Sequence, residues 1–346
     1  MEYEVRNFQA EDTGSVLDLM QLGLGGGPSG TRDEIFWRWK HYDNPFGRSI
    51  VLVATNGTGH IAGLRTFMQW HFRAGNRVVK AVRAVDTVTH PEHRRFGVFT
   101  TLTTKAVQQA KNSGVDVIFN TPNNSVLPGY LKLGWSHVSF VRPLVKVLNY
   151  PRFVSGIIRN RKRRQSSGQP PANQSYRYKL PLIADFLKRS EAVEELLRSN
   201  NQMRGERLST DQSIDYLRWR YSEYPNAEYA VLYQEKNGAL SSSAVIRANA
   251  RFGLKEIVID ELFFSKPDDT LASSLLHELK RCVNADYIIA YFPRSSFARH
   301  ALRKDGFLQV PTDGMNFTVN ALSQNLPCNP AVLENWNLSL GDLEVF

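Results

Sequence analysis

The sequence predicts an α/β protein built from two tandem copies of one fold, each a mixed sheet covered by helices. Strand-like and helical patterns alternate along both halves of the 346-residue chain, and this length suits two domains. A tryptophan-rich motif of the first half recurs in the second. A basic segment ending in Gly-Gln-Pro-Pro stands between the two copies, and such a composition is typical of a linker.

The first copy is expected over residues 1–150. Helices are predicted where apolar residues recur at helical spacing, as Val16, Leu19 and Met20 do. Strands are predicted where short apolar or alternating runs end at turn-forming residues. The expected strands cover residues 3–7, 50–54, 60–72, 77–89, 115–120 and a run from Trp135, and the expected helices cover residues 11–22, 32–41, 98–112 and 125–133.

The second copy is expected over residues 176–325, after a linker at 151–175. Arg38-Trp39-Lys40 aligns with Arg218-Trp219-Arg220, and a proline follows each tryptophan by six residues. Leu133-Gly134-Trp135 has its counterpart in Asp305-Gly306-Phe307. Several matches at a nearly constant offset predict a duplication. The remaining tail, residues 326–346, is expected to pack back near the acceptor site.

Composition excludes several classes of protein. The chain has 42% hydrophobic residues and a net charge of +10, which argues against global disorder. Its two cysteines, Cys282 and Cys328, exclude a disulfide scaffold and a cysteine-based zinc site, and we expect no metal. No signal peptide and no apolar run of about 18 residues is present. We therefore expect a soluble, cytoplasmic protein without a membrane span.

The positive charge is concentrated in one segment. Six basic residues and no acidic ones lie between Arg152 and Arg164. A solvated connection between the domains is the first interpretation. Nucleic-acid binding is disfavoured because no aromatic residues interleave with the charges, so no nucleic-acid partner is expected. The apolar neighbours Phe153, Ile157 and Ile158 leave a third interpretation open, a short helix on an anionic membrane surface.

The segment from Asp86 to Phe99 carries the most chemical information. A strand leads into a loop and then into a long helix, whose first N–H groups lack intrahelical partners and favour an anion. Gly97 allows the backbone to approach a ligand closely, and Arg94 and Arg95 add charge-assisted hydrogen bonds. The pattern predicts a phosphate cradle. Neither the P-loop spacing nor the dinucleotide fingerprint is present.

Three motifs together resemble the GNAT superfamily of acetyl-CoA-dependent N-acetyltransferases. Arg94-Arg-Phe-Gly-Val-Phe99 is similar to the family's phosphate loop, [Q/R]-x-x-G-x-[G/A], although its sixth residue is Phe. Val88-Thr-His-Pro91 is similar to the V-x-x-P lead-in, and Tyr130-Leu-Lys-Leu-Gly-Trp135 to the Y-x-K-x-G-[FW] pattern. The resemblance covers residues 1–140.

The resemblance implies where acetyl-CoA would bind. The pyrophosphate would lie on the loop and helix start from Arg94 to Phe99, and the pantetheine arm would lie along the strand around Val88. The implied cofactor-binding residues are Thr87, Val88, Thr89, Arg94, Arg95, Phe96, Gly97, Val98, Phe99 and Asn123. Tyr130 would be the general acid that protonates the departing thiolate. The alternative for Tyr130 is an aromatic side chain that packs on the sheet.

Asp86 is the candidate general base, because the attacking amine must lose a proton. It lies on the strand that leads to Val88, and alternation places both residues on one face. A carboxylate in an apolar strand is costly unless it is paired or functional. One alternative for Asp86 is a salt bridge to an arginine such as Arg83 or Arg65. His41, His71 and His90 are the alternative candidates for the base.

The second copy is predicted to be degenerate. Its segment from Ile259 to Thr270 contains no Arg-x-x-Gly and is acidic where pyrophosphate needs positive charge. Leu302 stands where Tyr130 stands in the first copy. We therefore expect one active site per chain.

The acceptor is predicted from two further segments. Trp37–Pro45 and Asn335–Asp342 resemble a tandem-GNAT subgroup of bacterial surface-polysaccharide pathways, whose members acetylate amino groups of nucleotide-linked sugars. The candidate substrate residues are Trp37, His41 and Asn44, which the second copy lacks. The alternatives are a protein, peptide or other small amine as acceptor, a tRNA-dependent aminoacyltransferase, and a non-catalytic CoA-binding protein. The chain could also form a homodimer.

Overall fold

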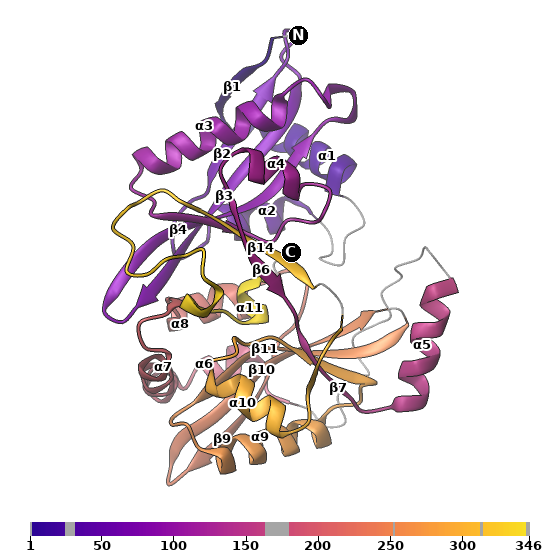
Figure 1. Cartoon of the computed structure of the whole chain (residues 1–346), viewed down its shortest axis with the longest axis vertical. Coiled ribbons are helices and arrows are strands. Elements are labelled where there is room, and N and C mark those ends of the chain that lie inside the picture. Colours follow the sequence, from indigo (N-terminus) through magenta and orange to yellow (C-terminus); the bar gives the residue numbers. More distant parts are fainter. Residues whose placement is uncertain (1, 25–31, 163–179, 252, 312–313, 344–346) are drawn as a thin grey trace. The chain divides into compact units, whose positions relative to one another are not determined.

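The computed structural model describes residues 2–24, 32–162, 180–251, 253–311 and 314–343 (Figure 1). It has the predicted mixed α/β fold and divides into two compact units. The first unit comprises Met1–Phe140 and Met315–Asn335, and the second comprises Val141–Gly314 and Trp336–Phe346. These bounds differ from the contiguous halves that the sequence predicts, because each unit takes one strand from the other half of the chain.

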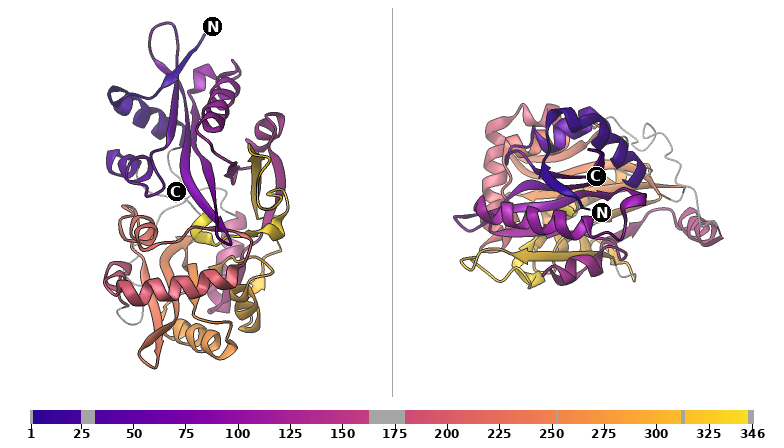
Figure 2. Two further views of the ribbon diagram at one scale, coloured as in Figure 1. Left: turned by 90° about the vertical axis from the view of Figure 1, so that its left-hand side faces the viewer. Right: turned by 90° about the horizontal axis from the view of Figure 1, so that it is seen from above.

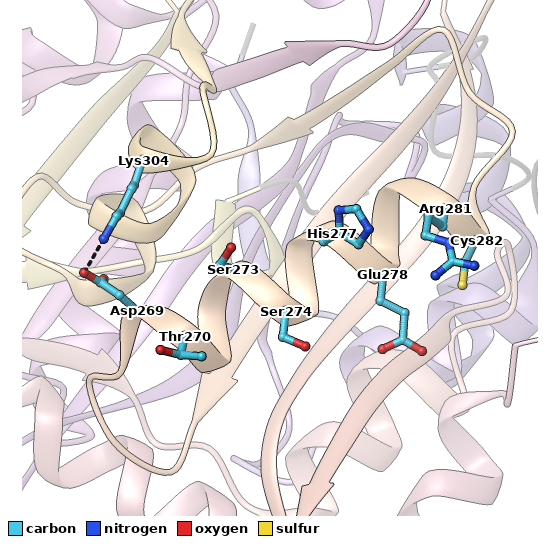
Figure 3. Close-up of a pocket in the computed structure, with 9 residues that line it drawn as sticks. All are labelled: Asp269, Thr270, Ser273, Ser274, His277, Glu278, Arg281, Cys282 and Lys304. Carbon is cyan, nitrogen blue, oxygen red and sulfur yellow. Dashed lines mark hydrogen bonds and ion pairs between the residues drawn. The ribbon is translucent and has the colours of Figure 1, made fainter.

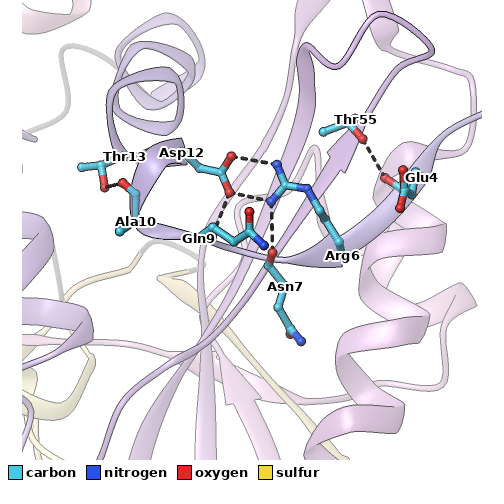
Figure 4. Close-up of polar contacts among 8 residues, drawn as sticks. All are labelled: Glu4, Arg6, Asn7, Gln9, Ala10, Asp12, Thr13 and Thr55. Atoms are coloured by element: carbon cyan, nitrogen blue, oxygen red, sulfur yellow. Dashed lines mark hydrogen bonds and ion pairs between the residues drawn. The ribbon is translucent and has the colours of Figure 1, made fainter.

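The first unit begins with a strand and a helix that are tied together by one ion pair. Arg6 donates from both terminal nitrogens to Asp12, at 2.6 and 2.8 Å, and the Gln9 N–H donates to the same carboxylate at 2.8 Å (Figure 4). This bidentate geometry fixes the turn between them. The elements of the unit are β1 (Glu4–Asn7), η1 (Ala10–Asp12), α1 (Thr13–Leu24), α2 (Glu34–His41), β2 (Ile50–Thr55), β3 (Ile61–Ala74), β4 (Arg77–Thr89), η2 (Pro91–His93), α3 (Val98–Asn112), β5 (Val117–Asn120), α4 (Leu127–Lys132), β6 (Ser136–Val141), β14 (Met315–Ala321) and η5 (Leu333–Asn335).

Helices cover both faces of this sheet, whose strand order is β1-β2-β3-β4-β5-β14-β6. α1 and α2 pack on one face together with Leu64 and Val88. α3 and α4 pack on the other face together with Phe67 and Val82 (Figure 2). α3 lies very close to β3, because a Cβ on Gly63 would stand 2.5 Å from Val98 Cγ1.

The second unit repeats the same succession of elements. The order of its elements is the same as in the first unit: a helix, three antiparallel strands, a long helix, a parallel strand and a short helix. This order fits the predicted duplication. The elements are β7 (Leu144–Val147), α5 (Tyr150–Lys162), α6 (Ile183–Leu187), α7 (Ser190–Arg204), β8 (Leu208–Thr210), α8 (Ile214–Leu217), the π-helical turn η4 (Arg218–Ser222), β9 (Ala230–Lys236), β10 (Ala239–Arg251), β11 (Leu254–Phe264), α9 (Asp269–Cys282), β12 (Tyr287–Ala290), α10 (Phe297–Lys304), β13 (Leu308–Gln309), β15 (Trp336–Asn337) and α11 (Leu340–Leu343).

The two sheets have exchanged one strand. The order β9-β10-β11-β12-β7-β13 mirrors that of the first unit, but β7 occupies the position equivalent to β14. β14 pairs antiparallel with β5 through Asn120↔Thr318 to Val117↔Ala321, and β7 pairs antiparallel with β12. Each copy therefore sends its last strand into the sheet of the other unit. The sequence pattern does not predict this exchange.

The local predictions hold well inside the first unit. The long helix runs over the expected residues, Val98–Asn112. The buried strand begins at Val117 rather than at residue 115, because the Val115 N–H still bonds to Ala110 O in the turn after α3. The start of the expected linker is helical, since α5 extends to Lys162; residues 163–175 lie outside the described residues. No helix in the described residues is long and apolar enough to cross a membrane.

The exchange predicts that residues 1–140 do not fold on their own. Without β14, the apolar strand Val117–Asn120 keeps an unpaired edge, and such edges favour aggregation. Residues 1–140 joined by a Gly/Ser linker to residues 314–335 are expected to unfold cooperatively, whereas residues 1–140 alone are not. The measurement is urea unfolding followed by circular dichroism. A cooperative transition of the short fragment at equal stability would contradict this prediction.

Candidate functional site

A bulge in β4 organises the site of the first unit. Leu64 pairs with Val88 and Thr66 with Val85, so Asp86 and Thr87 together stand opposite Arg65. Asp86 has a φ of 42°, in the left-handed region that few non-glycine residues adopt. Regular alternation would place Asp86 on the α3 face with Val82. The extra residue turns Asp86 toward α2 instead, while Thr87 faces α3.

On the α2 face, Asp86 accepts from two side chains of one helix. Lys40 Nζ lies 2.7 Å and His41 Nε2 lies 3.2 Å from Asp86 Oδ2. Lys40 and His41 are each 1% exposed, and His41 Nδ1 lies 2.9 Å from Ser49 Oγ. The ion-pair alternative for Asp86 named Arg83 or Arg65 as the partner. The structure shows Lys40 instead, because the bulge directs Asp86 to α2.

These contacts set the protonation states of the cluster. Burial alone would raise the pKa of Asp86, but the charge of Lys40 and the hydrogen bond from His41 hold it well below its usual range. Burial lowers the pKa of His41, although Asp86 opposes this shift. Asp86 is therefore an ionised carboxylate and His41 a neutral imidazole at neutral pH.

On the α3 face, Tyr130 and Thr87 both accept a hydrogen bond from Arg65. Arg65 Nη1 lies 2.7 Å from Tyr130 Oη and also donates to Thr87 Oγ1. Tyr130 is 3% exposed, and its ring packs edge-on against Phe99 and obliquely against Trp135. Tyr130 thus packs on the sheet and also holds its hydroxyl at the bulge, so the two interpretations of this residue are compatible.

The loop between β4 and α3 is exposed and basic. Gly97 precedes α3 with a φ of 81° and offers no side chain to cap it. The first N–H groups of α3, which have no intrahelical partner, therefore have no side-chain cap from Gly97 either. Among the described residues, no acidic side chain pairs with Arg94 or Arg95, and Phe96 is 53% exposed. Val98 and Phe99, in contrast, turn inward against the core. This arrangement can bind a phosphate group.

Beside this loop, β4 has a free edge. β4 and β5 run parallel and pair only at Ala81↔Val117, Val82↔Ile118 and Arg83↔Phe119. β4 continues to Thr89, while β5 ends at Asn120. No described strand pairs with this edge beyond Arg83. Its free N–H and C=O groups, which include those around Val88, can bind an extended ligand as a further strand would.

Asn123 helps to form the turn after β5. Its side-chain oxygen accepts from the N–H groups of Ser125 and Val126, each at 3.1 Å. This Asx-type turn leads into α4, which carries Tyr130. Asn123 is exposed, so its amide group remains accessible to a ligand.

The three predicted substrate residues are buried. Trp37, His41 and Asn44 are 2%, 1% and 4% exposed. The Trp37 and His41 rings lie 4.2 Å apart, and Asn44 Nδ2 donates to Gln69 O at 2.9 Å. The structure therefore brings His41 to Asp86 and packs Trp37 against His41, while Asn44 anchors the chain after α2. Their role in acceptor binding stays a prediction.

The second unit has a similar order of strands and helices, but the N-terminus of its long helix α9 is capped by a side chain. The side chain of Asp268 accepts from the N–H groups of Thr270 and Leu271 and so caps α9. A carboxylate thus occupies the position that an anion would need. Leu302, the counterpart of Tyr130, is fully buried in the apolar core.

Sequence reasoning missed the parts played by Lys40 and Arg65. The sequence contained a signal for Lys40, because Arg38-Trp39-Lys40 aligns with Arg218-Trp219-Arg220. The last residue of each trio, Lys40 or Arg220, is buried. In the second unit, a bulge in β11 places Asp260 where its charge acts on Arg220. No sequence signal marks Arg65, because its contacts depend on the bulge.

The second unit also has a surface hollow of about 960 Å³ along α9 (Figure 3). Mostly polar and charged residues line it. Lys304 Nζ bonds to Asp269 Oδ2 at 2.7 Å across one end. None of the predicted site residues lines it. In the described part of the chain, no cluster of three or more His, Cys, Asp or Glu side chains could hold a metal ion.

The buried histidine predicts a pH dependence of stability. Because burial lowers the pKa of His41, the unfolded chain, with a histidine pKa of about 6.5, binds a proton that the folded protein does not. The free energy of unfolding should fall as the pH drops below about 6.5, by at most ~1.4 kcal/mol per pH unit. Urea unfolding of wild type and His41→Gln, near pH 7.5 and near pH 5.5, measures this. Equal pH responses of the two proteins would refute it.

The second unit predicts the opposite trend. Burial, and then the neighbouring Asp342, raise the pKa of Glu261 to about 7, and Tyr221 Oη donates to Glu261 at 2.8 Å. A raised pKa contributes stability at low pH that is lost as the pH rises toward 7 and above. Glu261→Gln should therefore remove part of the loss of stability between pH 5 and pH 8. A loss of the same size in Glu261→Gln would show that another group causes it.

Comparison with known proteins identifies part of the chain. Residues 4–138 match the family model of the acetyltransferase (GNAT) domain. No curated protein matches the sequence. The GCN5-related N-acetyltransferase from Anabaena variabilis has a TM-score of 0.63 and 10% identity, and the match covers 93% of this chain and 73% of that one.

Two further structures share the fold. A probable N-acyltransferase from Enterococcus faecalis has a TM-score of 0.62 and 11% identity, over 93% of this chain and 73% of that one. N-myristoyltransferase from Saccharomyces cerevisiae, with bound myristoyl-CoA, has a TM-score of 0.59 and 11% identity, over 100% of this chain and 86% of that one. Residues 4–138 of the chain are therefore similar to the acetyltransferase (GNAT) domain, and the chain shares the fold of these solved structures.

Proposed function

We propose that this protein is an acetyl-CoA-dependent N-acetyltransferase with one active site, in the first unit, and that its acceptor is a nucleotide-linked amino sugar. One observation carries the proposal. The uncapped start of α3, with Arg94 and Arg95 beside it, adjoins the unpaired edge of β4 and the Tyr130 hydroxyl. These three features suit the pyrophosphate, the pantetheine arm and the sulfur of one acetyl-CoA molecule.

In the proposed complex, the pyrophosphate accepts hydrogen bonds from the N–H groups at the start of α3 and from Arg94 and Arg95. The pantetheine arm lies along the edge of β4 from Thr87 to Thr89, and the exposed Asn123 amide contacts it from the other side. Phe96 is the exposed aromatic side chain next to this path.

The reaction is a direct acyl transfer. The amine nitrogen attacks the thioester carbonyl carbon, a C–N bond forms, and the C–S bond breaks. The sulfur takes a proton from the Tyr130 hydroxyl, and the amine proton passes to a base. No covalent enzyme intermediate is required.

Asp86 is the proposed base. Lys40 and His41 keep it ionised, which is the form that accepts a proton, but its lowered pKa also makes it a weak base. Asp86→Asn would leave Lys40 buried without its anion and would also destabilise the first unit, by roughly 3–5 kcal/mol. Its kinetic effect therefore has to be measured at temperatures where unfolding data show that the variant is folded.

The acceptor class is supported by the resemblance of the segments Trp37–Pro45 and Asn335–Asp342 to a subgroup that modifies nucleotide-linked amino sugars. The proposal of one active site is supported by Asp268, which caps α9, and by Leu302 in place of a tyrosine.

Thiol release from acetyl-CoA across an amine panel tests the proposed function. The panel contains nucleotide-linked amino sugars, free amino sugars, polyamines and lysine peptides. We expect release only with a nucleotide-linked amino sugar, and a loss of 10²- to 10⁴-fold in Tyr130→Phe, the usual contribution of an acid–base group. Tyr150→Phe, an exposed tyrosine in the second unit, is the matched control. Thiol release with peptides would support the proposed acetyl transfer but contradict the proposed acceptor class. Absence of acetyl-CoA binding would refute the whole proposal.

The phosphate cradle makes a separate prediction. Arg94→Gln and Arg95→Gln should each raise the KM for acetyl-CoA by about ten- to a hundredfold, since a hydrogen bond to a charged group contributes about 1.5–3 kcal/mol. Arg281→Gln changes an exposed arginine of α9 and serves as the control. Steady-state kinetics with saturating acceptor measure the effect, and a KM in both loop variants equal to that of Arg281→Gln would contradict the assigned cradle.

A further inference from the structure

Arg65 is a fully buried arginine without an acidic partner. Its exposed fraction is 0%, and no Asp or Glu of the described residues forms an ion pair with it. Its Nε and Nη2 atoms are buried and make no hydrogen bond within the described part of the chain. A buried charge is costly unless it is paired or functional.

Aromatic rings replace the missing counter-ion in part. The guanidinium carbon lies 4.7 Å from the Phe67 ring centre, 5.1 Å from that of Tyr130 and 5.8 Å from that of Phe99. Cation–π contacts of this kind are stronger when the arginine is desolvated, as Arg65 is. They also hold the guanidinium at one place beside Tyr130.

The hydrogen bond to Tyr130 has a directional consequence. A phenol has one proton, and its oxygen can accept as well as donate. Arg65 cannot accept, so the Tyr130 oxygen is the acceptor in their contact at 2.7 Å. The Tyr130 proton must then point elsewhere, and no described residue accepts it. The ring itself is fixed by Phe99 and Trp135.

We propose that Arg65 is a positioning residue, which fixes the Tyr130 phenol as an acceptor and so directs its proton to the CoA sulfur. This inference rests on the proposed function. During transfer the C–S bond breaks, its electron pair stays on sulfur, and the sulfur takes the Tyr130 proton. Arg65 then donates to the phenolate oxygen until the product thiol leaves and the proton is restored from solvent.

A binding experiment tests this without knowledge of the acceptor. CoA and desulfo-CoA, in which hydrogen replaces the thiol, differ only at the sulfur. Isothermal titration near pH 8.5, where part of the thiol is ionised, gives the ratio of the two affinities. We expect wild type to prefer CoA by about tenfold, the size of one charge-assisted hydrogen bond. Tyr130→Phe and Arg65→Gln should each remove most of this preference. The double variant should lose no more than either single variant, because Arg65 acts through Tyr130.

Two further variants keep the test decisive. Arg65→Met has a similar volume without charge and tests the same loss if Arg65→Gln does not fold. Arg83→Gln removes another buried arginine of the same sheet, which donates to Thr121 rather than to Tyr130, and should keep the preference. In kinetics with an active acceptor, Arg65→Met should lower kcat with little change in the KM for acetyl-CoA.

The possible outcomes separate the two proposals. If wild type binds neither CoA nor desulfo-CoA, the proposed function is refuted. If wild type prefers CoA and Tyr130→Phe abolishes the preference while folded Arg65 variants keep it, only the positioning role of Arg65 is refuted. A shared, non-additive loss in Tyr130→Phe and the Arg65 variants supports it.

Discussion

One extra residue in β4 determines how both faces of the first sheet are used. Because Asp86 and Thr87 stand opposite the single residue Arg65, the strand sends a carboxylate toward α2 and a hydroxyl toward α3. The Asp86 carboxylate contacts Lys40 and His41. The Thr87 hydroxyl accepts a hydrogen bond from Arg65, which also donates to Tyr130. Bulges change the direction in which side chains point and increase local twist. The same bulge lies where β4 no longer pairs with β5, so the free edge of β4 and the side chains on both faces meet at one point.

The two units differ in chemistry more than in frame. Each unit buries a basic side chain from the helical segment before its sheet, Lys40 in the first unit and Arg220 in the second. Each also buries an aspartate at a bulge, Asp86 in β4 and Asp260 in β11. The second unit keeps a buried basic residue and a bulge aspartate although it lacks the phosphate loop. We infer that the main role of the Lys40–Asp86 pair is to hold α2 to the sheet. The start of α9 shows how the anion site was closed, since Asp268 now bonds to the N–H groups that the glycine-led α3 leaves free.

The sequence predicts this protein best where the determinants are local. The spacing of apolar residues predicts α3 to the residue, and the Arg94–Phe99 motif points to the loop that the structure shows as exposed and uncapped. Asp86 was singled out because a carboxylate in an apolar strand needs a partner, yet its partner was not predictable. The bulge breaks the alternation on which that reasoning depends. The contacts of Arg65 are not predictable for the same reason. The exchange of β7 and β14 is a pairing between segments that lie far apart in the sequence, and local pattern does not report it.

The exchanged strand also affects how the chain matures during synthesis. Asn120 and its partner Thr318 are 198 positions apart, so the ribosome must make most of the chain before the first sheet can be completed. Until then, the edge of β5 that β14 covers in the finished protein has no partner strand. Contacts of such long range slow folding, because a large loop must close before they form. The first sheet is therefore completed late, after the second copy has been made.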